Sequence, residues 1–111
     1  MALIDEGDRF KFQNDLDDQG NPAGGWARGT GIDIKFQNGP LGRGADRSAP
    51  NGAFIEDLLQ IVVYRLQYYQ GSKFACRENA LALTKVQEAL HWLNHRTADR
   101  ERRGVEGTHA D

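Results

Sequence analysis

The chain has 111 residues, of which 39% are hydrophobic and 27% are charged, and its formal net charge is −2 at pH 7. A chain of this length builds one small domain, or a modest core with irregular appendages. The near-neutral charge gives no general attraction to DNA or to an acidic membrane. No stretch approaches the ~20 apolar residues of a membrane span. We therefore expect a soluble cytoplasmic protein without a signal peptide, in which any anion-binding site is local.

The first part of the chain, residues 1–52, is rich in glycine and lacks helical periodicity. Residues 9–13 and 32–36 alternate between polar and apolar side chains, which predicts two short strands. The tetrapeptide Lys-Phe-Gln-Asn occurs at 11–14 and again at 35–38, as it would in two related strands that face each other. The intervening segments are predicted to be loops: 14–31 and 38–52. We expect a small antiparallel sheet that is not stable alone in water.

From residue 53 on, apolar residues recur at helical spacing and predict two helices, about 54–70 and about 76–103. Gly71-Ser72 ends the first helix, and Gly104 ends the second. The short connection makes the pair an antiparallel hairpin. The first helix has two neighbouring apolar stripes: Ile55, Leu58, Leu59, Val62, Leu66 and Tyr69, beside Phe54, Ile61, Tyr64 and Tyr68. The second has one: Leu83, Val86, Leu90 and Leu93, flanked by Ala82, Ala89 and Trp92.

Together these elements predict an α+β fold, in which a small N-terminal antiparallel sheet packs on a two-helix antiparallel hairpin. Residues 1–52 and 53–111 would form one domain. A hairpin whose first helix is apolar over two stripes needs more than one neighbour. Since one hairpin and one small sheet bury too little apolar surface for a chain of this size, we expect a homo-oligomer.

Three arginines of the second helix lie one above another: Arg96, Arg100 and Arg103 are spaced i, i+4 and i+7. Like charges at this spacing repel each other by a few tenths of a kcal/mol, so a partner usually compensates them. One interpretation is that Asp99 and Glu101 pair with them on a solvated helix end, where cations also suit the helix dipole. The other is a phosphate clamp, because guanidinium groups match phosphate oxygens.

Asn79, Val86, Leu93 and Arg100 follow one another at intervals of seven residues and project from one side of the helix. Asn79 and Arg100 are therefore about 31 Å apart at ~1.5 Å rise per residue. A small ligand does not span that distance on one chain. If both residues contact the same ligand, the pocket lies between two antiparallel subunits, and two equivalent pockets follow from the two-fold axis.

Tyr69 ends the first helix beside the turn, near Asn79, and its ring could stack on a purine. The more frequent role of such a residue is a core tyrosine with its hydroxyl at the surface. Tyr68 is the competing candidate for either role.

Catalytic and metal-binding arrangements are weakly supported. His91 and His95 are one turn apart, but Trp92 stands where the zinc-protease motif has glutamate, so we expect surface histidines. Cys76, the only cysteine, begins the second helix, and we expect it to be buried and inert. Since no nucleophile–base pair, phosphate-binding glycine loop or dinucleotide fingerprint is present, we expect a binding protein without cofactor, not an enzyme.

A series of spaced motifs over residues 31–108 resembles the first type of Thoeris anti-defence protein. In the second helix and after it the motifs are Cys76-Arg77-Glu78-Asn79-Ala80-Leu81-Ala82-Leu83-Thr84-Lys85, Trp92-Leu93, Arg96-Thr97, Asp99-Arg100-Glu101 and Gly104-Val105-Glu106-Gly107-Thr108. Before it they are Phe36-Gln37, Gly39-Pro40, Asn51-Gly52 and Glu56-Asp57-Leu58. This family shares its helical hairpin with a phage protein that counters cyclic-oligonucleotide defence.

The resemblance implies a sponge, a phage-encoded protein that sequesters a signalling nucleotide in the cytoplasm of the infected bacterium. Members bind the glycocyclic ADP-ribose signals made by bacterial TIR-domain enzymes and do not cleave them. They are dimers, or dimers assembled into hexamers, with a small N-terminal sheet and two helices. Some hexameric members also bind cyclic dinucleotides and trinucleotides. The alternatives here are therefore a hexameric sponge for cyclic di- and trinucleotides, and a non-binding structural oligomer.

The resemblance also assigns ligand-binding residues: Asn79 from the Arg-Glu-Asn motif, Arg96 from Arg-Thr, Arg100 from Asp-Arg-Glu, and Tyr69, where the family has phenylalanine. The loop over residues 41–50 is longer here, and Ile55 stands where the family has asparagine. Secondary candidates are Tyr68, Arg77, Arg103, Arg43 and Arg47.

Overall fold

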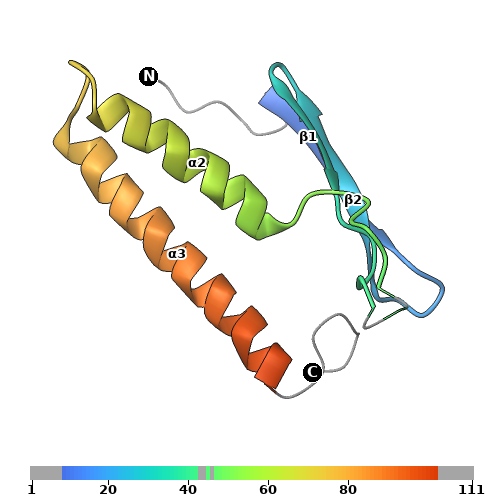
Figure 1. Cartoon of the computed structure of the whole chain (residues 1–111). Coiled ribbons are helices and arrows are strands. Elements are labelled where there is room, and N and C mark those ends of the chain that lie inside the picture. Colours follow the sequence, from blue (N-terminus) through green and yellow to red (C-terminus); the bar gives the residue numbers. More distant parts are fainter. Residues whose placement is uncertain (1–8, 43–44, 46, 103–111) are drawn as a thin grey trace. The chain divides into compact units, whose positions relative to one another are not determined.

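The computed structural model describes residues 9–42, 45 and 47–102, which form a three-stranded sheet followed by two helices (Figure 1). The predicted α+β class, with an N-terminal antiparallel sheet and a helical pair, is confirmed. The described residues fall into two compact units, one up to Phe54 and one from Ile55 on. The packing of the sheet on the hairpin as one domain, and the homo-oligomer, stay predictions.

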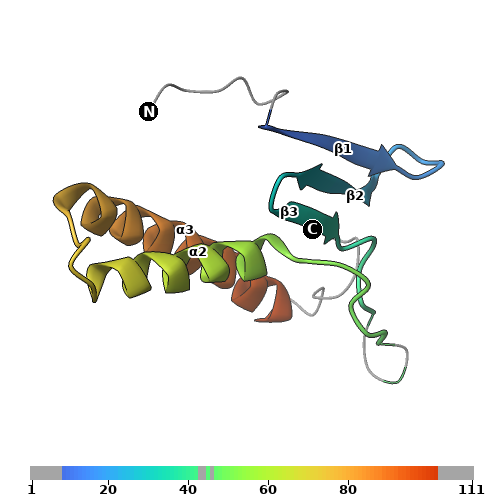
Figure 2. The same ribbon diagram turned by 90° about the horizontal axis from the view of Figure 1, so that it is seen from above.

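The sheet contains β1 (Phe10–Leu16), β2 (Pro22–Gly29) and β3 (Ile32–Phe36), antiparallel and in that order (Figure 2). The two predicted strands correspond to β1 and β3 and are confirmed. The prediction of a loop over 14–31 is wrong, because β2 lies within it as the central strand. The two Lys-Phe-Gln-Asn segments consequently do not face each other: one lies in β1 and the other begins at the end of β3, on opposite edges of the sheet.

The central strand escaped prediction because glycine, which disfavours strands, is required at several of its positions. Gly25 has a φ of +143°, and a Cβ atom there would overlap the carbonyl oxygen of Gln13 on β1. A Cβ at Gly29 would similarly overlap the carbonyl oxygen of Arg9. Because glycines occupy these positions, β2 lacks the regular alternation of side chains by which a strand is normally recognised.

The two faces of the sheet differ in character. Phe12, Ala27 and Ile34 lie side by side across the three strands, and Ala27 is buried. On the opposite face, the guanidinium of Arg28 lies 4.9 Å from the centroid of the Trp26 ring. The strand pattern thus gives the sheet one apolar and one polar face, as is common in antiparallel sheets.

The loop after β3 is closed at its base by a group of hydrogen bonds that we call the amide clasp, made by Gln37, Asn38 and Asn51. The Asn51 side chain accepts a hydrogen bond from the Asn38 amide (2.8 Å) and donates one to its carbonyl (3.0 Å). The Asn51 amide donates to Oε1 of Gln37 (2.9 Å). Phe36 and Ala53 then form a short parallel bridge. Two of the sequence motifs, Phe36-Gln37 and Asn51-Gly52, therefore have a structural role in closing this loop.

Helices α2 (Ile55–Gln70) and α3 (Arg77–Arg102) form the predicted antiparallel hairpin (Figure 1). Both ends of α2 and the start of α3 lie within one residue of the predicted positions. The predicted end of α3 at Arg103 and Gly104 lies outside the described residues. Within the described part of the chain, neither helix is long and apolar enough to cross a membrane.

A single stripe of α3 is shielded from solvent. Apart from Asp99, which is half-buried beside it, the half-buried residues of α3 form this stripe: Asn79, Leu83, Val86, Leu90, Leu93, Thr97 and Arg100. Their spacing alternates between four and three residues, the period at which a helix keeps one face toward a neighbour. On α2 the buried residue is Val63 (4% exposed), whereas Val62, which the predicted stripe contained, is 42% exposed. The predicted stripe of α3 is confirmed, but the flanking residues Ala82, Ala89 and Trp92 are exposed.

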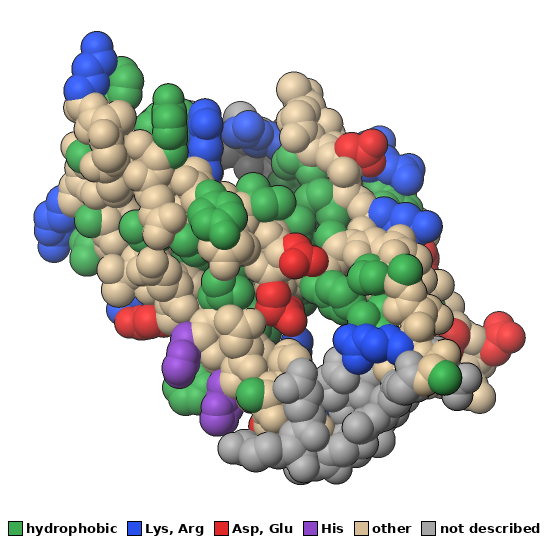
Figure 3. All heavy atoms as spheres, in the orientation of Figure 1, with side chains coloured by type: hydrophobic (Ala, Val, Ile, Leu, Met, Phe, Trp, Pro, Cys, Tyr) green, Lys and Arg blue, Asp and Glu red, His purple; other side chains and the backbone are tan. Residues whose placement is uncertain are grey.

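Much apolar surface of the single chain stays in contact with solvent. Among the described residues, Ala27 and Val63 are the only buried hydrophobic side chains. Ile61, Tyr64 and Tyr68 form an exposed row along α2, each more than 60% exposed. Figure 3 shows hydrophobic side chains at the surface of the molecule. An apolar surface of this kind marks an interaction site in a soluble protein.

Replacement of Gly25 by alanine tests the close approach between β1 and β2. We expect it to destabilise the protein by roughly 3 kcal/mol, because overlap with the Gln13 carbonyl adds to an unfavourable φ. Gly20→Ala is the matched control: φ there is +81°, but no atom lies within 4 Å of the added Cβ, so only about 1–2 kcal/mol is lost. Urea unfolding followed by Trp26 fluorescence in a Trp92→Phe background measures both, and equal losses would contradict the close approach.

Candidate functional site

The four predicted ligand-binding residues lie at the two ends of the hairpin. Tyr69 closes α2 and Asn79 lies in the first turn of α3, so both belong to what we call the turn end. Arg96 and Arg100 lie in the last turns of α3, and Arg96 contacts Glu56 near the start of α2. We call this second region the open end. Each end offers different chemistry, an aromatic ring with an amide at one and guanidinium groups at the other.

Side-chain hydrogen bonds fix the geometry of the turn end. Gln70 reaches across the turn, where its Nε2 donates to the Cys76 carbonyl (3.1 Å) and its Oε1 accepts from the Cys76 amide (3.0 Å). The Asn79 amide in turn donates to Sγ of Cys76 (3.4 Å), which therefore caps the start of α3. Cys76 is exposed, so its predicted burial is wrong, and the capping role explains its position.

Tyr69 is held at both its backbone and its hydroxyl. Its carbonyl accepts hydrogen bonds from the Ser72 amide (3.0 Å) and from Oγ of Ser72 (2.6 Å). Its hydroxyl accepts one from Nη2 of Arg65 (3.1 Å). Tyr69 is half-buried, whereas Tyr68 is 67% exposed and meets the Tyr69 ring edge-on at 5.8 Å. Of the two tyrosines, Tyr69 has the more fixed ring.

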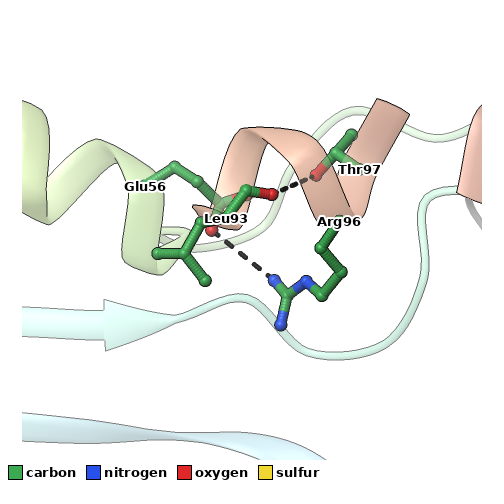
Figure 4. A network of polar contacts seen from close by, with 4 residues as sticks. All are labelled: Glu56, Leu93, Arg96 and Thr97. Atoms are coloured by element: carbon green, nitrogen blue, oxygen red, sulfur yellow. Dashed lines mark hydrogen bonds and ion pairs between the residues drawn. The ribbon is translucent and has the colours of Figure 1, made fainter. Parts of the chain in front are cut away.

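Arg96 crosses between the helices at the open end, where its Nη2 lies 3.8 Å from Oε1 of Glu56 (Figure 4). The Arg96 side chain is 60% exposed and that of Glu56 is 25% exposed. An ion pair this long and this solvated contributes little to stability. The guanidinium can therefore exchange its carboxylate partner for a phosphate at small cost. In the adjoining turn, Oγ1 of Thr97 donates to the Leu93 carbonyl (3.3 Å).

Arg100 occupies the half-buried stripe of α3, on the same side as Asn79. The predicted position of Arg100 on the side of Val86 and Leu93 is thus confirmed, whereas Arg96 is exposed. Arg103 is outside the described residues. With Asn79 and Arg100 separated by 21 residues of continuous helix, about 31 Å lies between them. A single chain does not bring the turn end and the open end together.

The secondary candidates are dispersed. Tyr68 and Arg77 are exposed at the turn end. Arg47 belongs to the other compact unit, and Arg43 lies outside the described residues. Sequence reasoning missed two contacts of the site, Arg65 and Glu56. The spacing of Arg65 four residues before Tyr69 was the available signal for the first. The contact with Glu56 depends on the hairpin and had no local signal.

The two histidines flank an exposed tryptophan. The rings of His91 and His95 lie 5.7 and 5.8 Å from Trp92, both at steep interplanar angles. In the part of the chain that the structure describes, no group of three or more histidine, cysteine or acidic residues is placed to hold a metal ion.

Comparison with known proteins shows what this hairpin is similar to. Residues 29–98 match the family model described as "Acb2/Tad1, hairpin domain". A protein of Bacillus phage SBSphiJ7 named "Thoeris anti-defense 1" is 57% identical over 76 residues, which are 68% of this chain and 51% of the relative. The chain therefore spans about half the length of the curated relative that it matches.

Proposed function

Because the chain belongs to the Acb2/Tad1 hairpin-domain family, we propose that it is a phage anti-defence protein that sequesters a signalling nucleotide. The proposed ligand is glycocyclic ADP-ribose, and the site of action is the cytoplasm of the infected bacterium. The name of the curated relative supports the role in counteracting Thoeris defence.

The observation that carries the proposal is the position of the candidate residues within the family match. Tyr69, Asn79 and Arg96 all lie inside the matched residues 29–98, and Arg100 follows two residues later. Cyclic ADP-ribose has a purine, two riboses and a pyrophosphate. An aromatic ring suits the purine, an amide suits its polar edge or a ribose hydroxyl, and two arginines suit the pyrophosphate.

The separation of the turn end from the open end supports a site built by two chains. In an antiparallel pair of hairpins, the turn end of one chain lies beside the open end of the other, and a two-fold axis makes two such sites. The exposed row of Ile61, Tyr64 and Tyr68 supplies apolar surface for self-association. We therefore propose that the functional form is a homodimer or an assembly of dimers.

The chemistry of the four proposed contact residues supports sequestration without cleavage. Their polar groups are guanidinium, amide and phenol, which bind and orient a nucleotide. Cleavage of a glycosidic or pyrophosphate bond calls for a nucleophile, or for acid and base groups aimed at the reacting atoms. Since a sponge must compete with the host receptor, we expect nanomolar affinity, corresponding to about 12 kcal/mol.

Calorimetric titration with both ribose-linked isomers of glycocyclic ADP-ribose tests the proposal. We expect tight binding of about one nucleotide per chain, with two equivalent sites for each dimer. The complex is then heated, and the released nucleotide is identified by chromatography. Intact nucleotide supports sequestration, altered nucleotide indicates an enzyme, and failure of both isomers to bind contradicts the proposed ligand.

The family description names two kinds of protein, which favours cyclic di- and trinucleotides as a second candidate ligand class. This alternative calls for a hexamer with sites separate from those described above. Mass in solution distinguishes the two, because a strict dimer argues against the hexameric sponge. If no nucleotide raises the melting temperature of the protein, the protein is instead a structural oligomer.

A further inference from the structure

Arg65 of α2 contacts both tyrosines of the turn end. Its guanidinium carbon lies 4.9 Å from the centroid of the Tyr69 ring and 5.5 Å from that of Tyr68. At the same time its Nη2 donates to the Tyr69 hydroxyl at 3.1 Å. One side chain thus both covers a ring face and fixes the rotation of that ring.

This arrangement makes the faces of Tyr69 unequal. A guanidinium over an aromatic ring is held by the ring quadrupole, so one face of Tyr69 is occupied. With Ser72 holding the Tyr69 carbonyl and Arg65 holding its hydroxyl, the ring is fixed at both ends. A planar base can then stack only on the face turned away from Arg65.

We propose that Arg65 is a positioning residue of the nucleotide site, which orders Tyr69 and leaves the opposite face of its ring for the purine. This inference rests on the proposed function and deepens it, because it identifies what orients the aromatic platform. It also accounts for the tyrosine: the hydroxyl that phenylalanine lacks has Arg65 as its partner.

Two substitutions separate positioning from a direct charge contact with the nucleotide. Arg65→Ala removes the contact, whereas Arg65→Lys keeps the positive charge but lacks the planar group that stacks and donates together. We expect both variants to bind glycocyclic ADP-ribose about tenfold more weakly, a loss of ~1.4 kcal/mol. Full affinity in the lysine variant would overturn the proposal. Lys73→Ala is the matched control, because Lys73 is an exposed cation that lies over Phe74 in the turn between the helices. This variant should keep the affinity of the parent.

A double-mutant cycle measures whether Arg65 acts through Tyr69. Arg65→Ala causes a certain fold-loss of affinity in the parent protein. In a Tyr69→Phe background we expect this fold-loss to be at least three times smaller, since the hydroxyl contact is already absent. If the fold-losses of affinity of the two single variants simply multiply in the double variant, the proposed coupling is overturned.

A readout without nucleotide distinguishes this inference from the proposed function. Fluorotyrosine at position 69 should show a different ¹⁹F chemical shift in Arg65→Ala and Arg65→Lys than in the parent, because the group over its ring has changed. An unchanged shift would overturn the inference even if the nucleotide binds tightly. A changed shift in a protein that binds no nucleotide would overturn the proposed function and leave Arg65 as a structural contact only.

Discussion

Replacing Arg100 by alanine is expected to weaken nucleotide binding severely while leaving the hairpin folded. Arg100 is half-buried on the inner stripe of α3, where a charge-assisted contact with a phosphate is screened less than at an open surface. Loss of such a contact costs about 2–5 kcal/mol, or roughly 30-fold to several-thousand-fold in affinity. Arg96→Ala should also weaken binding strongly, because it removes the second guanidinium proposed to bind the pyrophosphate.

The measurement is calorimetric titration of both variants, with circular dichroism to show that helix content is retained. Lys85→Ala is the matched control, since Lys85 is an exposed cation in the middle of the same helix and pairs only loosely with Glu88 at 3.8 Å. Its affinity should equal that of the parent. If both arginine variants bind the nucleotide as tightly as the parent, the open end is not part of the binding site.

The second large effect is expected when two inactive variants are mixed. The first carries Tyr69→Leu with Asn79→Ala and has a defective turn end, and the second carries Arg96→Ala with Arg100→Ala and has a defective open end. In a mixed dimer, the intact turn end of the second variant faces the intact open end of the first. One pocket is therefore complete and the other is doubly defective.

Random exchange of subunits makes half of the dimers mixed, so about a quarter of all sites should recover parent affinity. Titration before and after co-refolding measures this fraction. Each variant refolded alone is the control and should stay inactive. If the mixture stays inactive while mixed dimers are shown to form, the site is not shared between chains in the proposed way.

The helical half of the fold was predictable because its signals are local. Leu83, Val86, Leu90 and Leu93 keep one period over several turns, and Gly71 follows the end of α2. The choice between Val62 and Val63 was not local. Neither predicted stripe of α2 contained Val63, yet Val63 is buried and its neighbour Val62 is exposed.

The strand β2 could not be recognised from its own residues. Its glycines at 25 and 29 are required by the close approach of the Gln13 and Arg9 carbonyls, a contact that exists only once the sheet has formed. For the candidate site, the family motifs and the heptad spacing identified Asn79 and Arg100. The contact between Arg96 and Glu56, by contrast, depends on the hairpin geometry, which places residues 40 positions apart beside each other.

The amide clasp has a consequence for how this protein can change over time. Because Gln37, Asn38 and Asn51 tie the two ends of the loop to each other, residues inserted or deleted between them leave the hydrogen bonds of the clasp in place. Closing a longer loop costs little, about 0.6 kcal/mol for each doubling of its length. The segment between the clasp residues can therefore accept changes in length and charge at little cost in stability.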